Sequence, residues 1–136
     1  MTLSGPVTTT LVTGSSAVAR EQAIFAQLQL PDSHREDPKD CSMPLQAIVL
    51  EGLAPGHSPL DTLPAHVLRA RIAPGCLCCA GNLVLRVTLN RMLRQRPERL
   101  FIGVARSEHL DQLRSWLQAE PYDQLLWLTP DLTTSS

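Results

Sequence analysis

Apolar, strand-forming runs alternate with amphipathic segments along this chain, and that alternation restricts the fold more than any other feature. The runs LQAIVLEGL and ERLFIGVA are almost continuously apolar, which is typical of strands that are buried on both faces. Strands that alternate with helices indicate a mainly parallel sheet. We therefore predict an α/β fold of three layers, in which helices cover both faces of a sheet of about five strands. The expected strands are residues 6–14, 45–53, 65–75, 98–105 and 123–130.

Three segments between these strands have the apolar spacing of helices. In the first, which Pro31 ends, we expect Val18, Ile24, Phe25 and Leu28 to face the core. The expected core residues of the other two helices are Leu85, Leu89, Met92 and Leu93, and then Leu110, Leu113, Trp116 and Leu117. The solvent face of the second helix is expected to carry Arg86, Asn90, Arg91 and Arg94.

The chain length of 136 residues suits a single domain with one sizeable core. We expect residues 1–136 to form one domain with an ordered core at 5–130. Residues 31–44 are polar and bounded by prolines, so we predict a mobile surface loop there. Residues 131–136 are expected to be a frayed tail. There is no apolar run of 18 residues and no signal-peptide pattern, so we expect a cytoplasmic protein without a membrane span.

The cysteines are concentrated in one short stretch, IAPGCLCCAGNL, which holds Cys76, Cys78 and Cys79 within four positions. The Pro-Gly pair before them favours a loop over three small buried side chains. The surrounding segment 66–106 holds eight arginines and one acid, giving it a charge of +7 against −1 for the whole chain. A cationic environment favours the thiolate form of cysteine.

Close thiolates suit a soft or borderline metal ion such as Zn²⁺ or Cu(I). One short loop supplies two or three sulfur ligands, and such an incomplete shell fits transfer or sensing better than a closed structural site. The candidates for a further ligand are Glu51, His57, His66 and Cys41. The sequence favours solvated loop histidines at 57 and 66 and a free surface thiol at 41 over ligands at these three positions. Glu51 ends a predicted buried strand, where a carboxylate without a partner would be costly. A partly exposed position at the sheet edge explains Glu51 equally well.

Redox chemistry uses the same residues in a different way. Vicinal thiols of low pKa can oxidise to a disulfide and so sense oxidants. The sequence separates this thiol redox sensor poorly from a metal site.

With the element order and this loop together, the chain resembles the CobW-like family of metal-handling P-loop GTPases. The family carries a G-C-x-C-C motif between a strand and a helix, and GCLCC at residues 75–79 matches it in full. The resemblance extends by order of elements over residues 45–128. It implies a P-loop NTPase-like fold and a Zn²⁺-type ion on Cys76, Cys78 and Cys79. It also implies an acidic residue that helps to hold the ion, and Glu51 stands where that acid belongs.

The family's phosphate loop is degenerate in this chain. The family pattern is G-x-x-G-x-G-K-[ST] after the first strand, and the chain keeps Gly14 within LVTGSSAVARE. Ala17 and Ala19 replace glycines that let backbone amides face the phosphates. Arg20 replaces the lysine, and Glu21 replaces the hydroxyl that would hold Mg²⁺. Gly14 and Arg20 are thus a vestigial phosphate site, and we expect little or no GTP hydrolysis.

Further departures point to a truncated, degenerate relative. The family's E-x-x-G and guanine-reading N-K-x-D motifs do not appear. Three functions follow as hypotheses: a metal-binding module, a residual nucleotide binder or weak GTPase, and an interaction protein that docks a partner through its arginines. Nucleic acid is not expected, because aromatic residues make up only 4% of the chain and stacking is scarce. An open sheet edge is a candidate surface for a partner protein or a homodimer.

Overall fold

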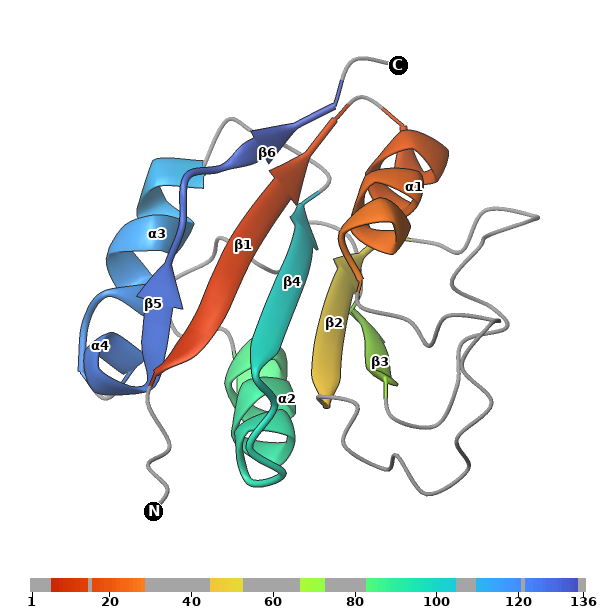
Figure 1. The fold of residues 1–136 in the computed structure, drawn as a ribbon. Coiled ribbons are helices and arrows are strands. Elements are labelled where there is room, and N and C mark those ends of the chain that lie inside the picture. The colour runs from red at the N-terminus through yellow and green to blue at the C-terminus, as the bar shows by residue number, and fades with distance from the viewer. Residues whose placement is uncertain are drawn as a thin grey trace, which may run out of the picture.

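A parallel sheet with helices on both faces forms the centre of the molecule (Figure 1). The computed structural model describes residues 6–14, 16–28, 45–52, 67–72, 83–104, 110–120 and 122–134. Along the chain the elements are β1 (Val7–Thr13), α1 (Ala17–Gln27), β2 (Gln46–Glu51), β3 (Val67–Ile72), α2 (Leu83–Leu93), β4 (Arg99–Val104), α3 (Leu110–Leu117), α4 (Tyr122–Leu125), β5 (Leu126–Leu128) and β6 (Leu132–Thr133). The predicted α/β class with a mainly parallel sheet is confirmed.

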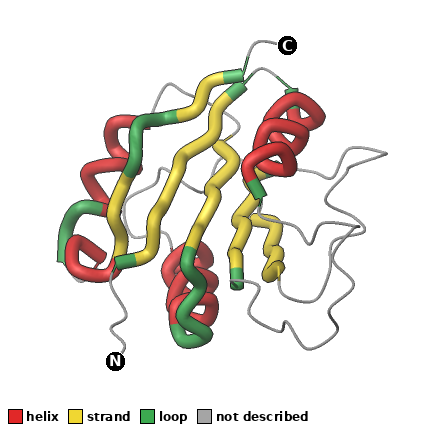
Figure 2. Tube along the Cα trace, in the orientation of Figure 1, coloured by secondary structure: helices red, strands yellow, loops and turns green. Residues whose placement is uncertain are grey.

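The strand order is β3-β2-β4-β1-β5, and β6 also pairs with β1. Each of these pairings is parallel. Because β4 lies between β2 and β1, the chain crosses over β4 when it passes from β1 through α1 to β2 (Figure 2). From β4 it runs the other way, through α3 and α4, to β5 on the far side of β1.

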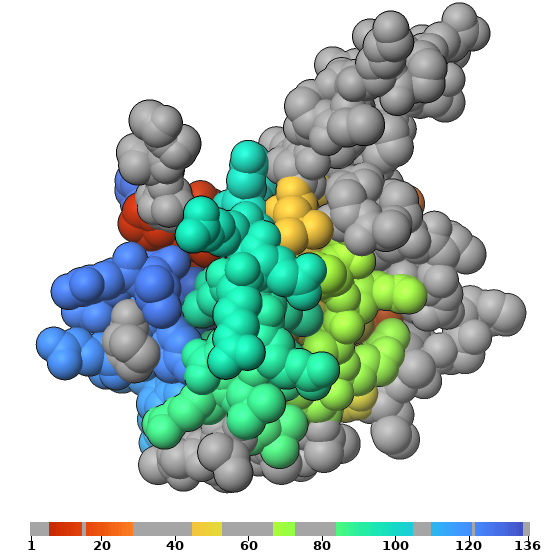
Figure 3. Space-filling model, turned by 90° about the horizontal axis from the view of Figure 1, so that it is seen from below, coloured from red at the N-terminus to blue at the C-terminus, as the bar shows by residue number. Residues whose placement is uncertain are grey.

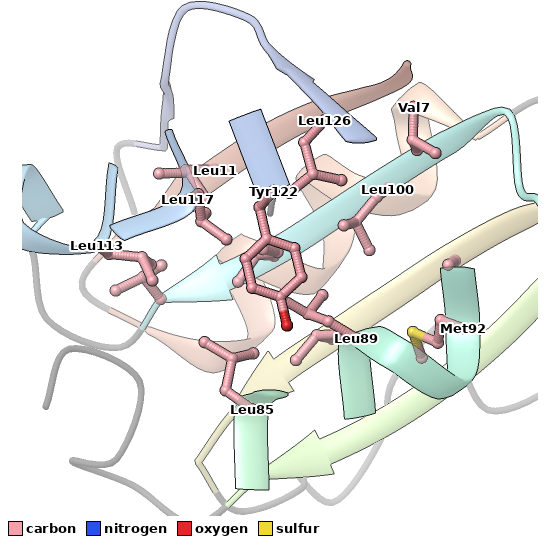
Figure 4. Close-up of a cluster of buried hydrophobic side chains, with 14 of the residues drawn as sticks. Val7, Leu11, Leu85, Leu89, Met92, Leu100, Leu113, Leu117, Tyr122 and Leu126 are labelled. Carbon is pink, nitrogen blue, oxygen red and sulfur yellow. The ribbon is translucent and has the colours of Figure 1, made fainter. Parts of the chain in front are cut away.

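The two faces of the sheet carry separate apolar clusters, because successive side chains of a strand point to opposite faces. On one face, α1 packs through Ile24 and Leu28 against Val12, Ile48 and Phe101. On the other face, α2, α3 and α4 pack on the alternate residues of the same strands (Figure 4). The labelled members of this second cluster are Val7, Leu11, Leu85, Leu89, Met92, Leu100, Leu113, Leu117, Tyr122 and Leu126. The predicted three layers are therefore present among the described residues.

Helices α2 and α3 bury the residues that the periodicity predicted. Leu85, Leu89 and Met92 are buried on α2, while Leu113 and Leu117 are buried on α3. Leu93, Leu110 and Trp116 are partly buried and pack against the same cluster. None of the described helices is long and apolar enough to cross a membrane.

The predicted stripe of α1 is wrong at two positions. Val18 is 41% exposed and Phe25 is 37% exposed, although Ile24 and Leu28 are buried as expected. The helix instead buries two charged side chains, Arg20 and Glu21. They replace apolar contacts because α1 lies over the polar carboxyl end of the sheet as well as over its core.

The carboxyl-terminal part of the chain also differs from the prediction. Residues 123–125, expected to begin the last strand, belong to α4, and β5 contains only Leu126–Leu128. Leu132 and Thr133, expected in a frayed tail, form β6 and pair with Val12 and Thr13 of β1. The Thr134 amide donates to the Thr13 carbonyl at 2.8 Å. The predicted loop at 31–44 lies outside the described residues.

Candidate functional site

The carboxyl ends of the parallel strands meet at one edge of the sheet, and the candidate site lies there. Connections leave β1 and β4 in opposite directions, so the gap between these two strands is a topological switch point. Ligands of open α/β sheets bind in the crevice beyond such a point. Gly14 follows β1 at this edge, and Ser16 caps α1 by accepting a hydrogen bond from the Ala19 amide at 3.0 Å.

The side chain of Arg20 contacts the turn that follows β1. Its Nη1 donates to the Gly14 carbonyl oxygen at 2.7 Å, and the residue is 7% exposed. Burial lowers the pKa of the Arg20 guanidinium, whereas the neighbouring carboxylates of Glu51 and Glu21 act in the opposite direction. The guanidinium stays charged nonetheless, because arginine is not deprotonated in proteins. A buried cation therefore stands beside the first turn of α1.

Glu21 is held by an arginine from the edge strand of the sheet. Its two carboxylate oxygens accept from Nη1 and Nη2 of Arg71 at 3.0 and 3.1 Å. The Glu21 side chain is 2% exposed and that of Arg71 is 30% exposed. This bidentate geometry, with two parallel hydrogen bonds, is a strong arrangement of an arginine and a carboxylate. It links Glu21 of α1 directly to β3.

Glu51 is the last residue of β2 and is 5% exposed. It pairs in register with Ile72, the last residue of β3, and the Gly52 amide donates to the Ile72 carbonyl at 2.9 Å. The carboxylate is close enough to Arg20 to raise the pKa of that guanidinium. We call Arg20, Glu21, Glu51 and Arg71 the rim cluster. Its two positive and two negative charges balance each other.

The predicted thiol site lies outside the described residues. All four cysteines and all four histidines of the chain, including Cys41, His57, His66, Cys76, Cys78 and Cys79, are in undescribed segments. Within the described ranges, no three His, Cys, Asp or Glu side chains gather as metal ligands would. The structure does fix the ends of the thiol segment, which follows Ile72 beside Glu51 and precedes Leu83 at the start of α2.

Of the predicted site residues, Gly14, Arg20 and Glu51 lie at the same edge of the sheet, and Arg20 interacts with the other two. Sequence reasoning missed Arg71 and the burial of Glu21. A signal for Arg71 was present, because an arginine near the end of a strand can meet an acid in the helix that crosses the sheet.

Searches against protein-family models, characterised proteins and solved structures found no match to this chain.

Proposed function

We propose that this chain is a metal-binding protein of the metallochaperone type, which holds a Zn²⁺-type ion on Cys76, Cys78 and Cys79. The observation that carries the proposal is the pairing of Glu51 with Ile72. This pairing lies at the point where the chain leaves β3 toward GCLCC. Cys76 follows Ile72 by four residues, and four residues of extended chain span at most about 14 Å. Thiolates from this loop and a buried carboxylate are ligands that suit zinc.

The rim cluster explains how Glu51 takes part. Without a metal, the negative charge of Glu51 is offset by the positive charge of Arg20, because the two side chains are close enough for the carboxylate to raise the pKa of the guanidinium. An ion on the thiolates would compete with Arg20 for that carboxylate. Competition of this kind weakens the binding of the ion by Glu51, as a transfer or sensing site requires.

We place the protein in the cytoplasm, where its thiols would stay reduced.

Metal content tests the proposal directly. We expect tag-free protein, purified with reductant, to contain about one zinc ion per chain and to retain it against a micromolar competing chelator. Cys78→Ser should abolish this retention, and Cys41→Ser is the matched control that should preserve it. Zinc-free wild-type protein that takes up no zinc in a titration would overturn the proposal. If mass spectrometry then finds a disulfide within residues 76–79, the thiol redox sensor replaces it.

A residual nucleotide site is the second candidate, on a P-loop NTPase-like fold. The switch point between β1 and β4, with Gly14 before a capped helix, favours a phosphate at this edge. Against it, the Gly14 carbonyl accepts a hydrogen bond from Arg20, and Glu21, which would bring negative charge near a phosphate, is held by Arg71. We therefore infer that the chain does not bind GTP at millimolar concentration and shows little or no GTP hydrolysis. Calorimetric titration with GTP and Mg²⁺ tests this inference, because binding at millimolar nucleotide would revive the second candidate.

An open sheet edge remains our proposed surface for a homodimer or partner. Strands β3 and β5 are the end members of the described strand path. Unpaired backbone groups on such strands can pair with another chain. Light scattering of the purified protein measures whether a dimer forms.

A further inference from the structure

Helix α2 has an exposed face that combines apolar and basic side chains. Val84 is 54% exposed and Val87 is 47% exposed, which is unusual for valines on a helix beside a packed core. Arg91 continues the same line along the exposed side, and so does Arg94, which lies directly after the helix and whose amide donates to the Asn90 carbonyl at 3.2 Å. The four residues are spaced by three, four and three positions, so they form one stripe on the helix surface. We call these four residues the α2 stripe.

The stripe points away from the sheet. The buried residues of α2 are Leu85, Leu89 and Met92, and they occupy the opposite side of the helix. Figure 3 shows the molecule from below, where α2 forms part of the central surface. Ten residues separate the ends of the stripe, which corresponds to about 15 Å along the axis. That length matches about three turns of a second helix.

Positive charge predominates along α2 and the turn that follows it. Residues 83–97 contain four arginines, at 86, 91, 94 and 96, and no acid. Both ion pairs seen among the described residues use other arginines, Arg71 and Arg114. Burial raises the pKa of the Tyr122 hydroxyl, and Arg86 lies near enough to offset part of this rise. The surface therefore carries an excess of positive charge that a partner with carboxylates would balance.

We infer that the α2 stripe docks an acidic amphipathic helix of another protein. Apolar side chains of that helix would cover Val84 and Val87, and its carboxylates would meet Arg91 and Arg94. The spacing of the stripe is that of helix-to-helix packing, in which side chains meet at intervals of three and four. Such docking goes beyond metal binding and does not depend on whether the thiols hold an ion.

Nucleic acid fits this surface less well. Phosphates would pair with the arginines but would gain nothing from the two exposed valines. Single strands also need aromatic side chains for stacking. The exposed aromatic residues among the described ones, Phe25 and Trp127, lie on α1 and β5 and not on α2.

The test uses three fluorescent probes with the full chain and measures their anisotropy. The first is a short helical peptide of Glu and Leu, with leucines at intervals of three and four. The second is a scrambled peptide of the same composition, and the third is a short DNA duplex. We expect the first peptide to bind at least tenfold more tightly than the scrambled one. Equal binding of both peptides, or tighter binding of the duplex, would overturn the inference.

Two double variants locate the binding on the stripe. The first double variant is Arg91→Gln with Arg94→Gln, and the second is Val84→Ser with Val87→Ser. Each should weaken the binding of the first peptide by about threefold to tenfold. The matched control is Gln112→Glu with Gln124→Glu, which lowers the net charge by the same amount as the arginine pair at exposed positions of α3 and α4. If the control weakens binding as much as the arginine pair does, general charge accounts for the binding and the stripe does not.

Discussion

Arg71 on β3 holds both carboxylate oxygens of Glu21 on α1, at 3.0 and 3.1 Å, across 50 positions of sequence. The pair connects the first helix to the outermost strand of the sheet, although β1 and β3 are separated by β4 and β2. It also removes the Glu21 carboxylate from water. Glu21 is thus part of a structural ion pair.

Breaking this pair from one side should destabilise the fold. Arg71→Met leaves the Glu21 carboxylate buried without its partner, which we expect to lower the free energy of unfolding by about 2–3 kcal/mol. This value lies below the range for fully buried pairs because the Arg71 side chain is 30% exposed. Urea unfolding at neutral pH measures the change.

The double variant separates the pair from its desolvation cost. With Glu21→Met added, the carboxylate that Arg71 neutralised is no longer there to be buried, and we expect most of the lost stability to return. Arg94→Met, at an exposed position in the turn that follows α2, should change stability by no more than about 0.5 kcal/mol. If Arg71→Met were equally mild, Glu21 would not depend on Arg71 in the folded state.

Strands β1 to β4 and helices α2 and α3 were predictable because each follows a single periodicity. Apolar runs at β2 and β4 are buried on both faces, and the spacing of Leu85, Leu89 and Met92 identifies one side of α2. Helix α1 is present as predicted, but Val18 and Phe25 are exposed because the buried side of the helix faces the polar carboxyl edge as well as the apolar core. A pattern of apolar spacing cannot detect Arg20 and Glu21, whose burial is made tolerable by partners distant in sequence.

The site was predictable only in part, for a related reason. Gly14 and Glu51 follow or end strands, so their place at the carboxyl edge follows from a parallel sheet. The register that brings Glu51 beside Ile72 depends on how β2 and β3 pair, and a single sequence does not specify that pairing. The pairing of β6 with β1 was missed because two residues are too short to give a strand pattern.

Gly14 should tolerate no side chain while Thr134 is in place. A Cβ at Gly14 would overlap Thr134 Oγ1 and would lie 3.2 Å from Thr134 Cβ and 3.3 Å from Arg20 Cγ. We expect Gly14→Ala to cost about 1–3 kcal/mol through overpacking. Thermal unfolding of Gly14→Ala, of Thr134→Ala and of the double variant forms a cycle. If the stability changes of the two single variants simply add in the double variant, the contact is contradicted. A clash between residues 14 and 134 predicts instead that the double variant is more stable than this sum.

Arg96 ends the turn after α2 in a backbone conformation that favours glycine. Its φ is 55°, and its amide donates to the Leu93 carbonyl at 3.0 Å. A residue with a Cβ costs about 1–2 kcal/mol in this left-handed region, while glycine loses more chain entropy on folding. We expect Arg96→Gly to stabilise the protein by about 0.5–1 kcal/mol, measured by urea unfolding. Arg96→Ala is the control without this relief, and equal stability of the two variants would contradict the prediction.

Tyr122 should make the fold sensitive to alkaline pH. Its ring lies among the buried leucines of α2 and α3 (Figure 4), and its hydroxyl donates to Asn90 Oδ1 at 3.0 Å. Burial raises the pKa of the Tyr122 hydroxyl above its ordinary value of 10.0, and Arg86 offsets this only in part. The folded state thus holds the proton more tightly than the unfolded state. The contribution of this hydroxyl to stability is fully present below about pH 10 and is lost as the pH rises through the folded pKa.

Comparison with Tyr122→Phe isolates this effect, because Tyr122 is the only tyrosine of the chain. The variant loses one hydrogen bond to an exposed amide, so we expect it to be less stable than the wild type by about 0.5–1.5 kcal/mol at neutral pH. Above about pH 10 the wild type should lose stability faster than the variant, and the difference between them should shrink. Urea unfolding in steps from neutral to alkaline pH measures both curves. Parallel curves would mean that the phenol titrates alike in the folded and unfolded chains, contrary to its burial.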